Sequence, residues 1–371
     1  MKKIIHLITS LQYGGTEKFL NTLISNDNKN LHVVISLKKN SNDDIVFNKN
    51  VDIINLNFSY NLFFNFFELI KLFKILKTYN IQALNLWLYH TFLIGSIFSF
   101  FLSNKKIIWH VRCDYKLYKK NLLSKIYLFI CKIIIKITKN IIIVFNSKAA
   151  LDSHIINKIS SINKIIDNGT DTSIFLPKEN ISQIIINNKL ITKSNFNIGI
   201  LARFHPDKNH ELFFKAIKKF DLITKNYLVV MAGLEINHTN KNLISLLKKY
   251  DLEKKIILLG TVKNIHELIP YLDINVLTSK SESFPNSIIE AMSCSVPSII
   301  PDIGNISNIV GDCGFVFEKN NFRDCYKKIK FFYENYYKKA NLHLLKNKNR
   351  TRVIENYSMT SCVSKFQEVW K

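Results

Sequence analysis

The hydrophobic residues of this chain are concentrated in short, nearly continuous runs, and longer stretches with helical spacing lie between them. Runs that are apolar at successive positions are typical of strands buried on both faces of a parallel sheet. One intervening stretch, Thr16–Ser25, places Phe19, Leu20 and Leu23 on a single helical face. The strands predicted in the first half are Lys3–Thr9, His32–Leu37, Asp52–Asn57, Ala83–Leu88, Lys106–Val111, Ile141–Phe145 and Lys164–Ile166.

The second half of the chain repeats this alternation. Two such blocks in 371 residues predict an α/β protein with two doubly wound domains. The polar segment 177–195 is the expected linker, so the domains are expected at 1–185 and 186–371, with a last helix, Cys362–Trp370, that packs back on the first domain. Such domains bind ligands at the carboxyl ends of their strands, which favours a cleft between the two. The predicted strands here are Asn197–Leu201, Tyr227–Ala232, Lys255–Leu259, Ile274–Ser279, Ser298–Ile300 and Phe315–Phe317.

Two cations follow the first predicted strand of the second half. Arg203 comes directly after this strand, Lys208 follows on the same loop, and Asn209 is placed to cap the helix Glu211–Phe220. Cations at the carboxyl end of a strand, beside a helix N-terminus, form an anion site. Ordinary surface charge explains the pair about as well, because the chain has 52 Lys and Arg residues.

Two glutamates flank a Phe-Pro-Asn loop later in the chain. Glu282 lies in the loop, and Glu290 lies one turn into a predicted helix that Asn286 is placed to cap. Free backbone N–H groups of residues 284–288 favour a phosphate or a sugar oxygen, and carboxylates accept hydrogen bonds from sugar hydroxyls. Complementing the helix dipole would explain Glu290 alone, but it would not explain Glu282.

Three further features carry weaker signals. The pair Gly14-Gly15 follows the first strand and lets the backbone approach a ligand, although a plain strand-to-helix turn explains it nearly as well. His110 ends a buried strand, where a lone histidine is more often structural than catalytic. The sequence contains no Asp-x-Asp, the carboxylate pair that generally holds a nucleotide diphosphate through a divalent metal. Cationic side chains would have to neutralise such a diphosphate here.

The net charge of +24 indicates an anionic partner, which could be nucleic acid, an acidic membrane leaflet or a phosphorylated substrate. The six cysteines show no C-x-x-C spacing, so no zinc site or redox pair is indicated, and a reducing cytosol is expected. The stretch Lys3–Thr9 is predicted to form a strand rather than part of a signal peptide. The longest apolar stretch, Thr91–Leu102, is shorter than the ~20 residues of a membrane-spanning helix.

Taken together and in this order, the motifs resemble the retaining GT-B glycosyltransferases of glycosyltransferase family 4. The resemblance covers most of the chain, and its most specific parts are the basic pair and the E-x7-E stretch. The matching positions are Gly14-Gly15-Thr16-Glu17, Asn146-Ser147, Asn168-Gly169-Thr170-Asp171 with Phe175 and Pro177, Arg203 and Lys208, and Glu282-Ser283-Phe284-Pro285-Asn286 with Glu290-Ala291-Met292.

The resemblance implies a GT-B fold, in which two Rossmann-like domains face a central cleft. It implies metal-independent, retaining transfer of a hexose-type sugar from a UDP- or GDP-sugar, without a cofactor. In the roles implied, Glu282 and the backbone of the following loop hold the donor sugar, Glu290 holds the ribose, and the basic pair holds the diphosphate. The site residues it implies are Glu282 and His110 beside the donor sugar, and Gly15, Arg203, Lys208, Phe284, Pro285, Asn286, Ser287 and Glu290 in donor binding.

Two positions depart from the family pattern. Ser283 stands where the family usually has glycine, and Ser295-Val296 replaces the usual glycine before Pro297. A side chain at position 283 is expected to tighten the sugar pocket. The departures therefore bear on the identity of the donor sugar more than on activity.

The segment Arg112–Lys139 is basic and aromatic, with Asp114 as its single acidic residue. This composition suits an interfacial helix on anionic lipid, although a solvated helix face in a Lys-rich chain is the alternative. It favours a lipid-linked glycan acceptor, as in lipopolysaccharide or capsule synthesis, and a peripheral position at the inner face of the cytoplasmic membrane. Its basic residues are Arg112, Lys116, Lys119, Lys120, Lys125, Lys132, Lys136 and Lys139, and its aromatic residues include Tyr115, Tyr118, Tyr127 and Phe129.

Two other classes of protein fit part of the sequence. Nucleotide-sugar epimerases share the GT-B architecture, but they lack the E-x7-E pattern in this form. A non-enzymatic nucleic-acid binder is suggested by the charge alone, and no recognition motif supports it. We therefore expect no nucleic-acid partner.

Overall fold

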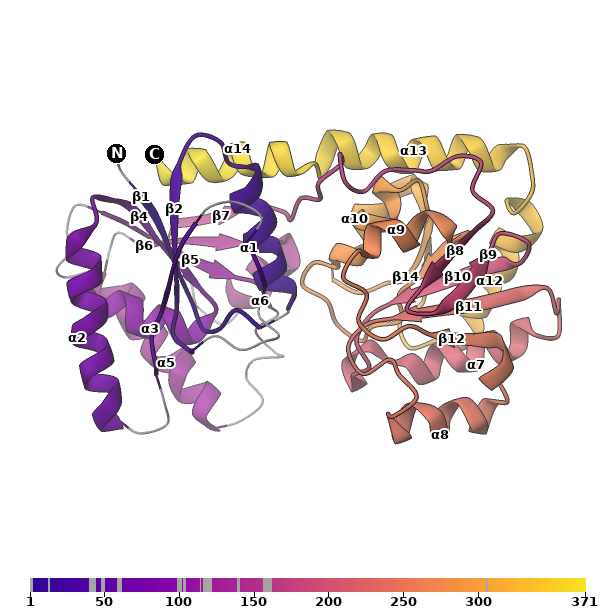
Figure 1. Cartoon of the computed structure of the whole chain (residues 1–371), viewed down its shortest axis with the longest axis horizontal. Helices are drawn as coiled ribbons and strands as arrows, with labels where there is room; N and C mark the ends of the chain where they lie inside the picture. Colours follow the sequence, from indigo (N-terminus) through magenta and orange to yellow (C-terminus); the bar gives the residue numbers. More distant parts are fainter. Residues whose placement is uncertain are drawn as a thin grey trace. The chain divides into compact units, whose positions relative to one another are not determined.

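The chain divides into two compact units, each of which contains its own parallel sheet (Figure 1). Unit 1 comprises Met1–Gly169 and Met359–Lys371, and unit 2 comprises Thr170–Ser358. The structure is a computed structural model that describes residues 3–12, 14–39, 45–47, 51–58, 62–98, 102, 105–113, 115, 122–138, 141–155, 162–304 and 306–371.

The sheet of unit 1 has the strand order β3-β2-β1-β4-β5-β6-β7, and every pairing in it is parallel. The order reverses at β1, which pairs with β2 on one side and β4 on the other. This reversal is the mark of a doubly wound fold, in agreement with the prediction. The strands are β1 Lys3–Ile8, β2 Leu31–Ser36, β3 Asp52–Asn55, β4 Ile81–Trp87, β5 Lys106–Val111, β6 Ile141–Phe145 and β7 Ile162–Ile165.

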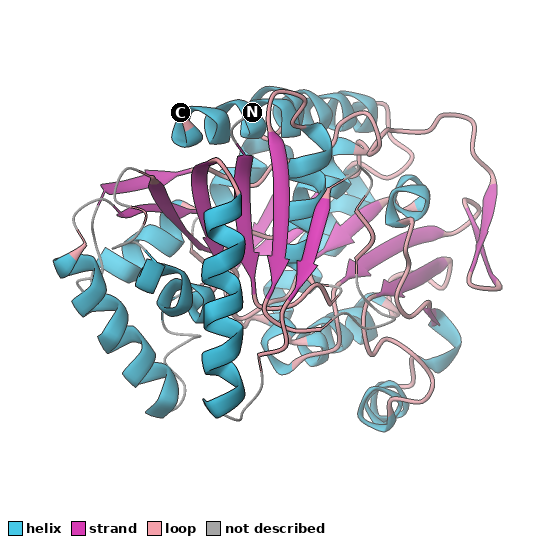
Figure 2. Ribbon diagram, turned by 60° about the vertical axis from the view of Figure 1, so that its left-hand side comes forward, coloured by secondary structure: helices cyan, strands magenta, loops and turns pink. Residues whose placement is uncertain are grey.

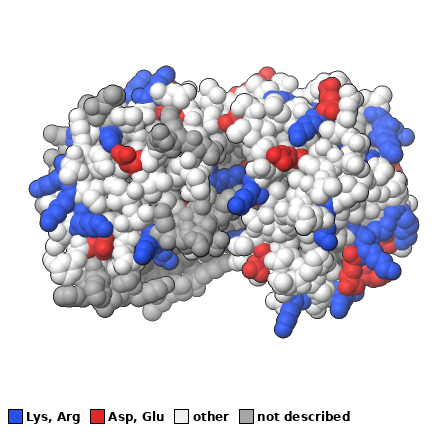
Figure 3. All heavy atoms as spheres, in the orientation of Figure 1, with Lys and Arg blue, Asp and Glu red and all other residues white. Residues whose placement is uncertain are grey.

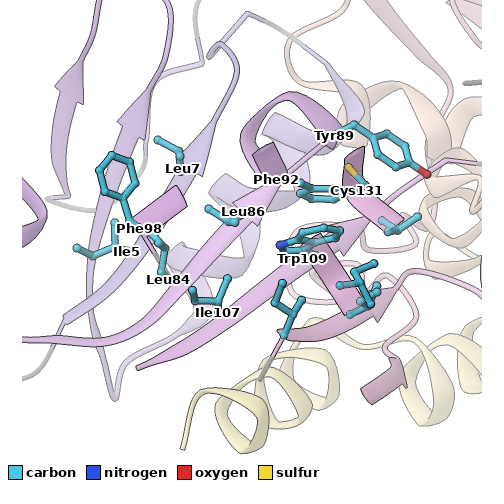
Figure 4. Close-up of a cluster of buried hydrophobic side chains, with 14 of the residues drawn as sticks. Ile5, Leu7, Leu84, Leu86, Tyr89, Phe92, Phe98, Ile107, Trp109 and Cys131 are labelled. Carbon is cyan, nitrogen blue, oxygen red and sulfur yellow. The ribbon is translucent and has the colours of Figure 1, made fainter. Parts of the chain in front are cut away.

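Helices cover both faces of this sheet (Figures 1 and 2). On one face, side chains from α2, α3, α5 and α6 pack with inward residues of the strands; Phe92 of α3, for example, stacks on Trp109 of β5 with ring centroids 4.6 Å apart (Figure 4). On the other face, α1 and α14 enclose a second apolar cluster. The helices are α1 Gly15–Asn26, α2 Leu62–Thr78, α3 Tyr89–Ile97, α5 Leu122–Ile137, α6 Lys148–Ile155 and α14 Met359–Trp370.

The last helix, α14, belongs to unit 1 and is held there by polar contacts as well as by apolar packing. Trp370 Nε1 donates to Asn85 Oδ1 at 2.9 Å, and Gln367 Nε2 donates to Asp27 Oδ1 at 2.9 Å. Asp27 is fully buried and also contacts His32, whose ring packs edge-on against Trp370. The chain therefore returns to its first unit after completing the second.

The sheet of unit 2 has the order β12-β11-β10-β13-β14-β15, again with only parallel pairings among the described strands. It reverses between β10 and β13. The strands are β10 Phe196–Leu201, β11 Tyr227–Ala232, β12 Ile256–Leu258, β13 Ile274–Val276, β14 Ser298–Pro301 and β15 Phe315–Phe317. The helices are α7 His210–Phe220, α8 Lys241–Tyr250, α9 Ile265–Leu268, α10 Asn286–Ser293, α11 Ile306–Val310, α12 Phe322–Asn335 and α13 Asn341–Asn356, with single 3-10 turns at η2 Pro206–Lys208, η3 Glu253–Lys255, η4 Ile269–Tyr271 and η5 Gly311–Cys313.

The segment predicted to be an irregular linker contains an antiparallel hairpin, β8 Gln183–Ile186 and β9 Lys189–Thr192. Its two-residue turn is Asn187-Asn188, and both asparagines have positive φ (47° and 59°), as tight hairpin turns require. Asn187 Nδ2 donates to Leu259 O at 2.7 Å, and Ile191 is fully buried in a cluster of unit 2. The expected domain boundary at 185 and 186 thus falls inside this hairpin, whereas the units divide at Gly169 and Thr170.

No helix among the described residues combines the length and the apolar character that crossing a membrane requires. The long helices α2 and α5 also pack one side against the sheet of unit 1.

Candidate functional site

Two loops of unit 2 meet at the carboxyl edge of its sheet. One loop follows β10 and carries Arg203 and Lys208; the other follows β13 and carries Glu282. Because β10 and β13 are adjacent parallel strands, their following loops start side by side. The strand order reverses between these two strands, and open α/β sheets bind ligands at such a switch point.

Glycine and main-chain contacts fix the first loop. Gly233, at the end of β11, has φ 150°, and a Cβ there would lie 2.4 Å from Ala202 O and 2.8 Å from Arg203 N. Only glycine therefore allows this close approach. Phe204 N also donates to Leu234 O at 2.8 Å. The Arg203 side chain is exposed on the loop positioned in this way.

Asn209 occupies the N-cap position of α7, as predicted, but its side chain does not cap the helix. Its backbone is left-handed (φ 54°, ψ 46°), which ends the 3-10 turn η2 before α7 begins at His210. The amide instead donates to Asn320 Oδ1 at 3.4 Å. The turn η2 places Lys208 directly before this left-handed residue.

The Lys208 ammonium and the Glu282 carboxylate form an ion pair between the two loops. Their side chains are 23% and 12% exposed, so the pair is largely shielded from water. Ser279 Oγ donates to the same Glu282 oxygen at 2.6 Å, and Thr278 Oγ1 donates to Lys208 O at 2.9 Å. The structure thus brings together the predicted diphosphate-binding lysine and the predicted sugar-binding glutamate.

Helix α10 begins one residue earlier than predicted. Its N-cap is Pro285, and Asn286 is its first helical residue, so the prediction of Asn286 as the N-cap was wrong. Proline has no side-chain acceptor, so the N-cap residue itself does not cap this N-terminus. The helix start therefore places the positive end of its dipole beside the loop of Glu282.

The remaining predicted residues of this stretch differ in exposure. The Phe284 side chain is buried in an apolar cluster and packs edge-on against Tyr357, so only its backbone is open to a ligand role. Pro285 is buried, whereas Asn286 and Ser287 are partly exposed. Glu290 lies on the second turn of α10 and is only 9% exposed.

Arg350 of α13 anchors the far end of α10, a role that the sequence analysis missed. Its guanidinium donates to Phe175 O at 2.8 Å, to Thr172 O at 2.9 Å and to Ser293 O at 2.6 Å. Ser293 Oγ donates to Phe175 O as well, at 2.7 Å. The segment between Asp171 and Pro177 therefore has a structural role. Its main-chain carbonyl groups accept hydrogen bonds from Arg350 and Ser293, and these bonds hold the helix that carries Glu290. An arginine far along the chain gives no sequence signal of this contact.

In unit 1, Gly15 is the first residue of α1, and a Cβ built there would have no atom within 4 Å. Its neighbour Gly14 differs, because a Cβ there would lie 2.3 Å from Glu17 Oε2. Glu17 is 9% exposed, and burial raises the pKa of its carboxyl group, with the Arg112 charge opposing this shift. Arg112 is partly buried, and its Nη2 donates to Asn168 Oδ1 at 2.6 Å.

His110 lies inside unit 1. It is 0% exposed, its Nε2 lies 2.8 Å from Asn85 Oδ1, and its ring stacks on Trp87 at 4.0 Å between centroids. Burial, and then the Arg112 charge, lower the pKa of its imidazole well below the usual value. A neutral, enclosed ring fits a structural role, and the predicted position of His110 beside the donor sugar stays a prediction.

His210 lies directly behind the Lys208 loop and is 3% exposed. Burial, and then the positive charge of Lys208, lower its pKa to about 4. An unfolded histidine titrates near 6.5, so below that pH the unfolded chain binds a proton that the folded chain binds only near pH 4. The free energy of unfolding is therefore at its full value above pH 6.5, and it decreases as the pH falls below 6.5.

From pH 7.5 to pH 5, we expect wild type to lose about 2 kcal/mol more unfolding free energy than His210→Leu. Urea denaturation followed by far-UV circular dichroism would measure this difference. Equal pH dependence by circular dichroism would show that His210 does not titrate in this way.

Among the described residues, no three His, Cys, Asp or Glu side chains converge as a metal site would need. All six cysteines are free thiols, and only Cys113 is not buried. Figure 3 shows the Lys and Arg side chains spread over the visible face of both units, without a single dominant patch.

The model of the family described as "Glycosyl transferases group 1" matches residues 182–361, which include both site loops and α10. Over 145 residues, or 37% of this chain and 35% of the relative, the sequence is 28% identical to the putative glycosyltransferase EpsF of Bacillus subtilis. Over 211 residues, or 56% of this chain and 53% of the relative, it is 23% identical to UDP-Gal:alpha-D-GlcNAc-diphosphoundecaprenol alpha-1,3-galactosyltransferase of Escherichia coli. The matches thus span about half or less of these relatives.

The fold is similar to that of HepE from Anabaena, whose crystal structure is in complex with UDP. The TM-score is 0.79 at 16% identity, and the match covers 99% of this chain and 98% of that one. A similarity at this identity establishes the α/β GT-B fold with its two parallel sheets of seven and six strands. Residues 182–361 therefore belong to the family of glycosyl transferases group 1, and the whole chain has the GT-B fold.

Proposed function

We propose that the protein transfers a hexose-type sugar from a nucleotide diphosphate sugar, UDP- or GDP-linked, to a surface-glycan acceptor. The observation that carries the proposal is the meeting of the Arg203–Lys208 loop, Glu282 and the N-terminus of α10 at the switch point of the unit 2 sheet. Cations and helix N–H groups suit a diphosphate, and carboxylates suit sugar hydroxyls. All of these residues lie within the matched family segment.

In the proposed reaction, the bond between the sugar and the β-phosphate oxygen breaks, and the electron pair stays on that oxygen. Arg203, Lys208 and the first turn of α10 would stabilise the charge that develops there, an electrostatic contribution that is often the largest in such sites. None of the described side chains in unit 2 is positioned as an obvious covalent nucleophile. Retention of configuration, with the leaving phosphate accepting the acceptor proton, follows from the family resemblance and is part of the proposal.

A panel of UDP-, GDP- and ADP-sugars, with nucleotide release measured for each, tests this proposal. One or two donors should release nucleotide faster when a glycan or lipid-linked acceptor is added. Conversion of a donor into its epimer without release would favour the epimerase alternative. No release and no conversion with any donor or acceptor preparation would contradict the proposal.

We further propose a lipid-linked acceptor and a peripheral position on an anionic membrane, on the inner face of the cytoplasmic membrane. The names of the Escherichia coli relative and of a Campylobacter jejuni relative, which is 28% identical over 178 residues, include diphosphoundecaprenol-linked acceptors. Lys116, Lys119, Lys120 and Tyr118 of the predicted membrane segment lie outside the described residues. The described part, α5, supports the proposal through its exposed side chains.

Helix α5 is apolar on two sides. Leu128, Cys131 and Ile135 face the core of unit 1. At about 100° per residue, a second apolar stripe faces away from the sheet, and lysines lie along one edge of it. Helix α5 contains no acidic residue. The outward stripe consists of Ile126, Phe129, Ile130, Ile133 and Ile137, which are 38–64% exposed, and the lysines beside it are Lys125, Lys132 and Lys136.

We expect the protein to co-sediment with phosphatidylglycerol vesicles, more strongly at low salt than at high salt. Each basic residue near such a surface contributes about 1 kcal/mol, which salt screens. Changing Lys116, Lys119, Lys120 and Lys125 to Glu should weaken the salt-sensitive part, and Phe129→Ser with Ile133→Ser should reduce the salt-resistant part. Binding equal to wild type in both variants would place the membrane surface elsewhere, and no binding by wild type would favour a soluble acceptor.

A further inference from the structure

We propose that Glu282 is the resting counter-ion of Lys208 and that its charge weakens the binding of the nucleoside diphosphate product, so that it promotes product release. This inference rests on the proposed function, because it concerns the same site. It gives Glu282 a second role besides contact with the donor sugar. The role arises from the ion pair that the two residues form in the structure.

The pair is part of the contact between the two loops. Its members are 74 positions apart in the sequence, and each is fixed by bonds that do not depend on the pair itself. Ser279 Oγ holds the Glu282 carboxylate at 2.6 Å, which orients the oxygen that contacts Lys208. Thr278 Oγ1 holds the Lys208 carbonyl, and Lys280 N donates to Asp207 O at 2.7 Å, so the two main chains are joined as well.

The low exposure of both side chains strengthens the electrostatic interactions of the pair. An ion pair in water contributes little, but attraction and repulsion both grow when water is excluded. A diphosphate that approaches Lys208 must share the ammonium with Glu282 or displace it. The diphosphate must also lie close to the Glu282 carboxylate, and the two negative charges repel each other in a site that is shielded from water.

This repulsion distinguishes the product from the donor. In the donor, the β-phosphate is esterified to the sugar. After transfer it is a terminal phosphate, which carries close to one further negative charge at neutral pH because its second pKa is near 6. The Glu282 charge therefore disfavours the free diphosphate more than the donor. Replacing Glu282 by glutamine keeps the shape of the side chain and removes the charge.

Isothermal titration calorimetry of UDP, GDP and ADP into wild type and Glu282→Gln, with EDTA present, tests the inference. For a diphosphate that wild type binds, Glu282→Gln should bind about tenfold more tightly. Glu253→Gln is the matched control, since it removes an exposed carboxylate at the opposite edge of the unit 2 sheet, and it should bind the diphosphates like wild type. Circular dichroism would verify that each variant is folded.

A double-mutant cycle identifies the route of the effect. If Glu282 acts through Lys208, the gain should shrink or vanish when Glu282→Gln is made in a Lys208→Ala background. Unchanged or weaker diphosphate binding by Glu282→Gln, with wild type binding normally, would overturn this inference and leave the proposed function intact. If wild type binds none of the three diphosphates, the proposed function itself fails, and the inference fails with it.

Discussion

Glu290→Gln is expected to lower the rate of sugar transfer by about tenfold or more, and Glu282→Gln is expected to do the same. Each variant loses a charge-assisted hydrogen bond to the substrate, which contributes about 1.5–3 kcal/mol. Tenfold in rate corresponds to about 1.4 kcal/mol. Initial rates at saturating and at low donor concentration would measure the effect on kcat and on kcat/KM separately.

The two variants should differ in the kinetic constant they affect. Glu290 lies on the second turn of α10, and its proposed partner is the ribose, which keeps its structure throughout the reaction. Its loss should therefore appear largely in KM for the donor. Glu282 lies in the loop before α10, and its proposed partner is the sugar that is transferred. Its loss should appear in kcat as well, because slower diphosphate release would add to weaker sugar positioning.

Glu253→Gln is a suitable control for this experiment. Glu253 is an exposed carboxylate in the turn η3 that precedes β12, so it lies at the opposite edge of the unit 2 sheet. Its replacement should leave transfer unchanged. Near-normal kinetics in both Glu282→Gln and Glu290→Gln, with the fold intact, would remove these glutamates from the donor site.

The sequence was a good guide to the sheets, for a physical reason. Strands buried on both faces are apolar at nearly every position, and this signal does not depend on distant parts of the chain. The predicted runs Lys106–Val111, Ile141–Phe145, Tyr227–Ala232 and Phe315–Phe317 coincide with β5, β6, β11 and β15. Once the strands are known, the rule that parallel sheets bind ligands at their carboxyl ends predicts the two loops of the candidate site.

Contacts between distant residues were beyond the reach of local patterns. The pairing of Lys208 with Glu282 depends on which strands become neighbours, and the anchoring of α10 by Arg350 depends on the return path of α13. The burial of His110 depends on Trp87 and on α14, which completes unit 1 from the end of the chain. None of these follows from spacing in the sequence.

Two local features were misread for a different reason. The hairpin β8–β9 turns on two asparagines with positive φ, where glycine is the stronger signal, and the segment was therefore predicted to be an irregular linker. Helix α10 starts after Pro285, although Asn286 is the better capping residue by preference. Pro285 has no side-chain acceptor with which to cap the helix, and it lies in a loop of the candidate site, where local preference is expected to fail.

Lys208→Ala and Arg203→Ala are each expected to weaken donor binding by about tenfold to a hundredfold. Lys208→Ala should have the larger effect. It removes one cation from the diphosphate and also leaves the Glu282 carboxylate in a shielded position without its ion-pair partner. Arg203 is exposed, so water screens its contribution more strongly. Lys215→Ala, an exposed lysine on α7 that lies near Glu211, is the matched control and should bind the donor normally.

Chelation separates cationic neutralisation of the diphosphate from neutralisation by a metal. If Arg203 and Lys208 balance the charge, transfer in EDTA should equal transfer in Mg²⁺ or Mn²⁺, and neither ion should restore Lys208→Ala. The expectation rests on the basic pair at the β10 loop and on a sequence that lacks the Asp-x-Asp pair typical of metal-held diphosphates. Loss of transfer in EDTA that Mg²⁺ or Mn²⁺ restores would show that a metal carries this charge instead. In that event, the Lys208–Glu282 pair would act in positioning the two loops rather than in holding the diphosphate.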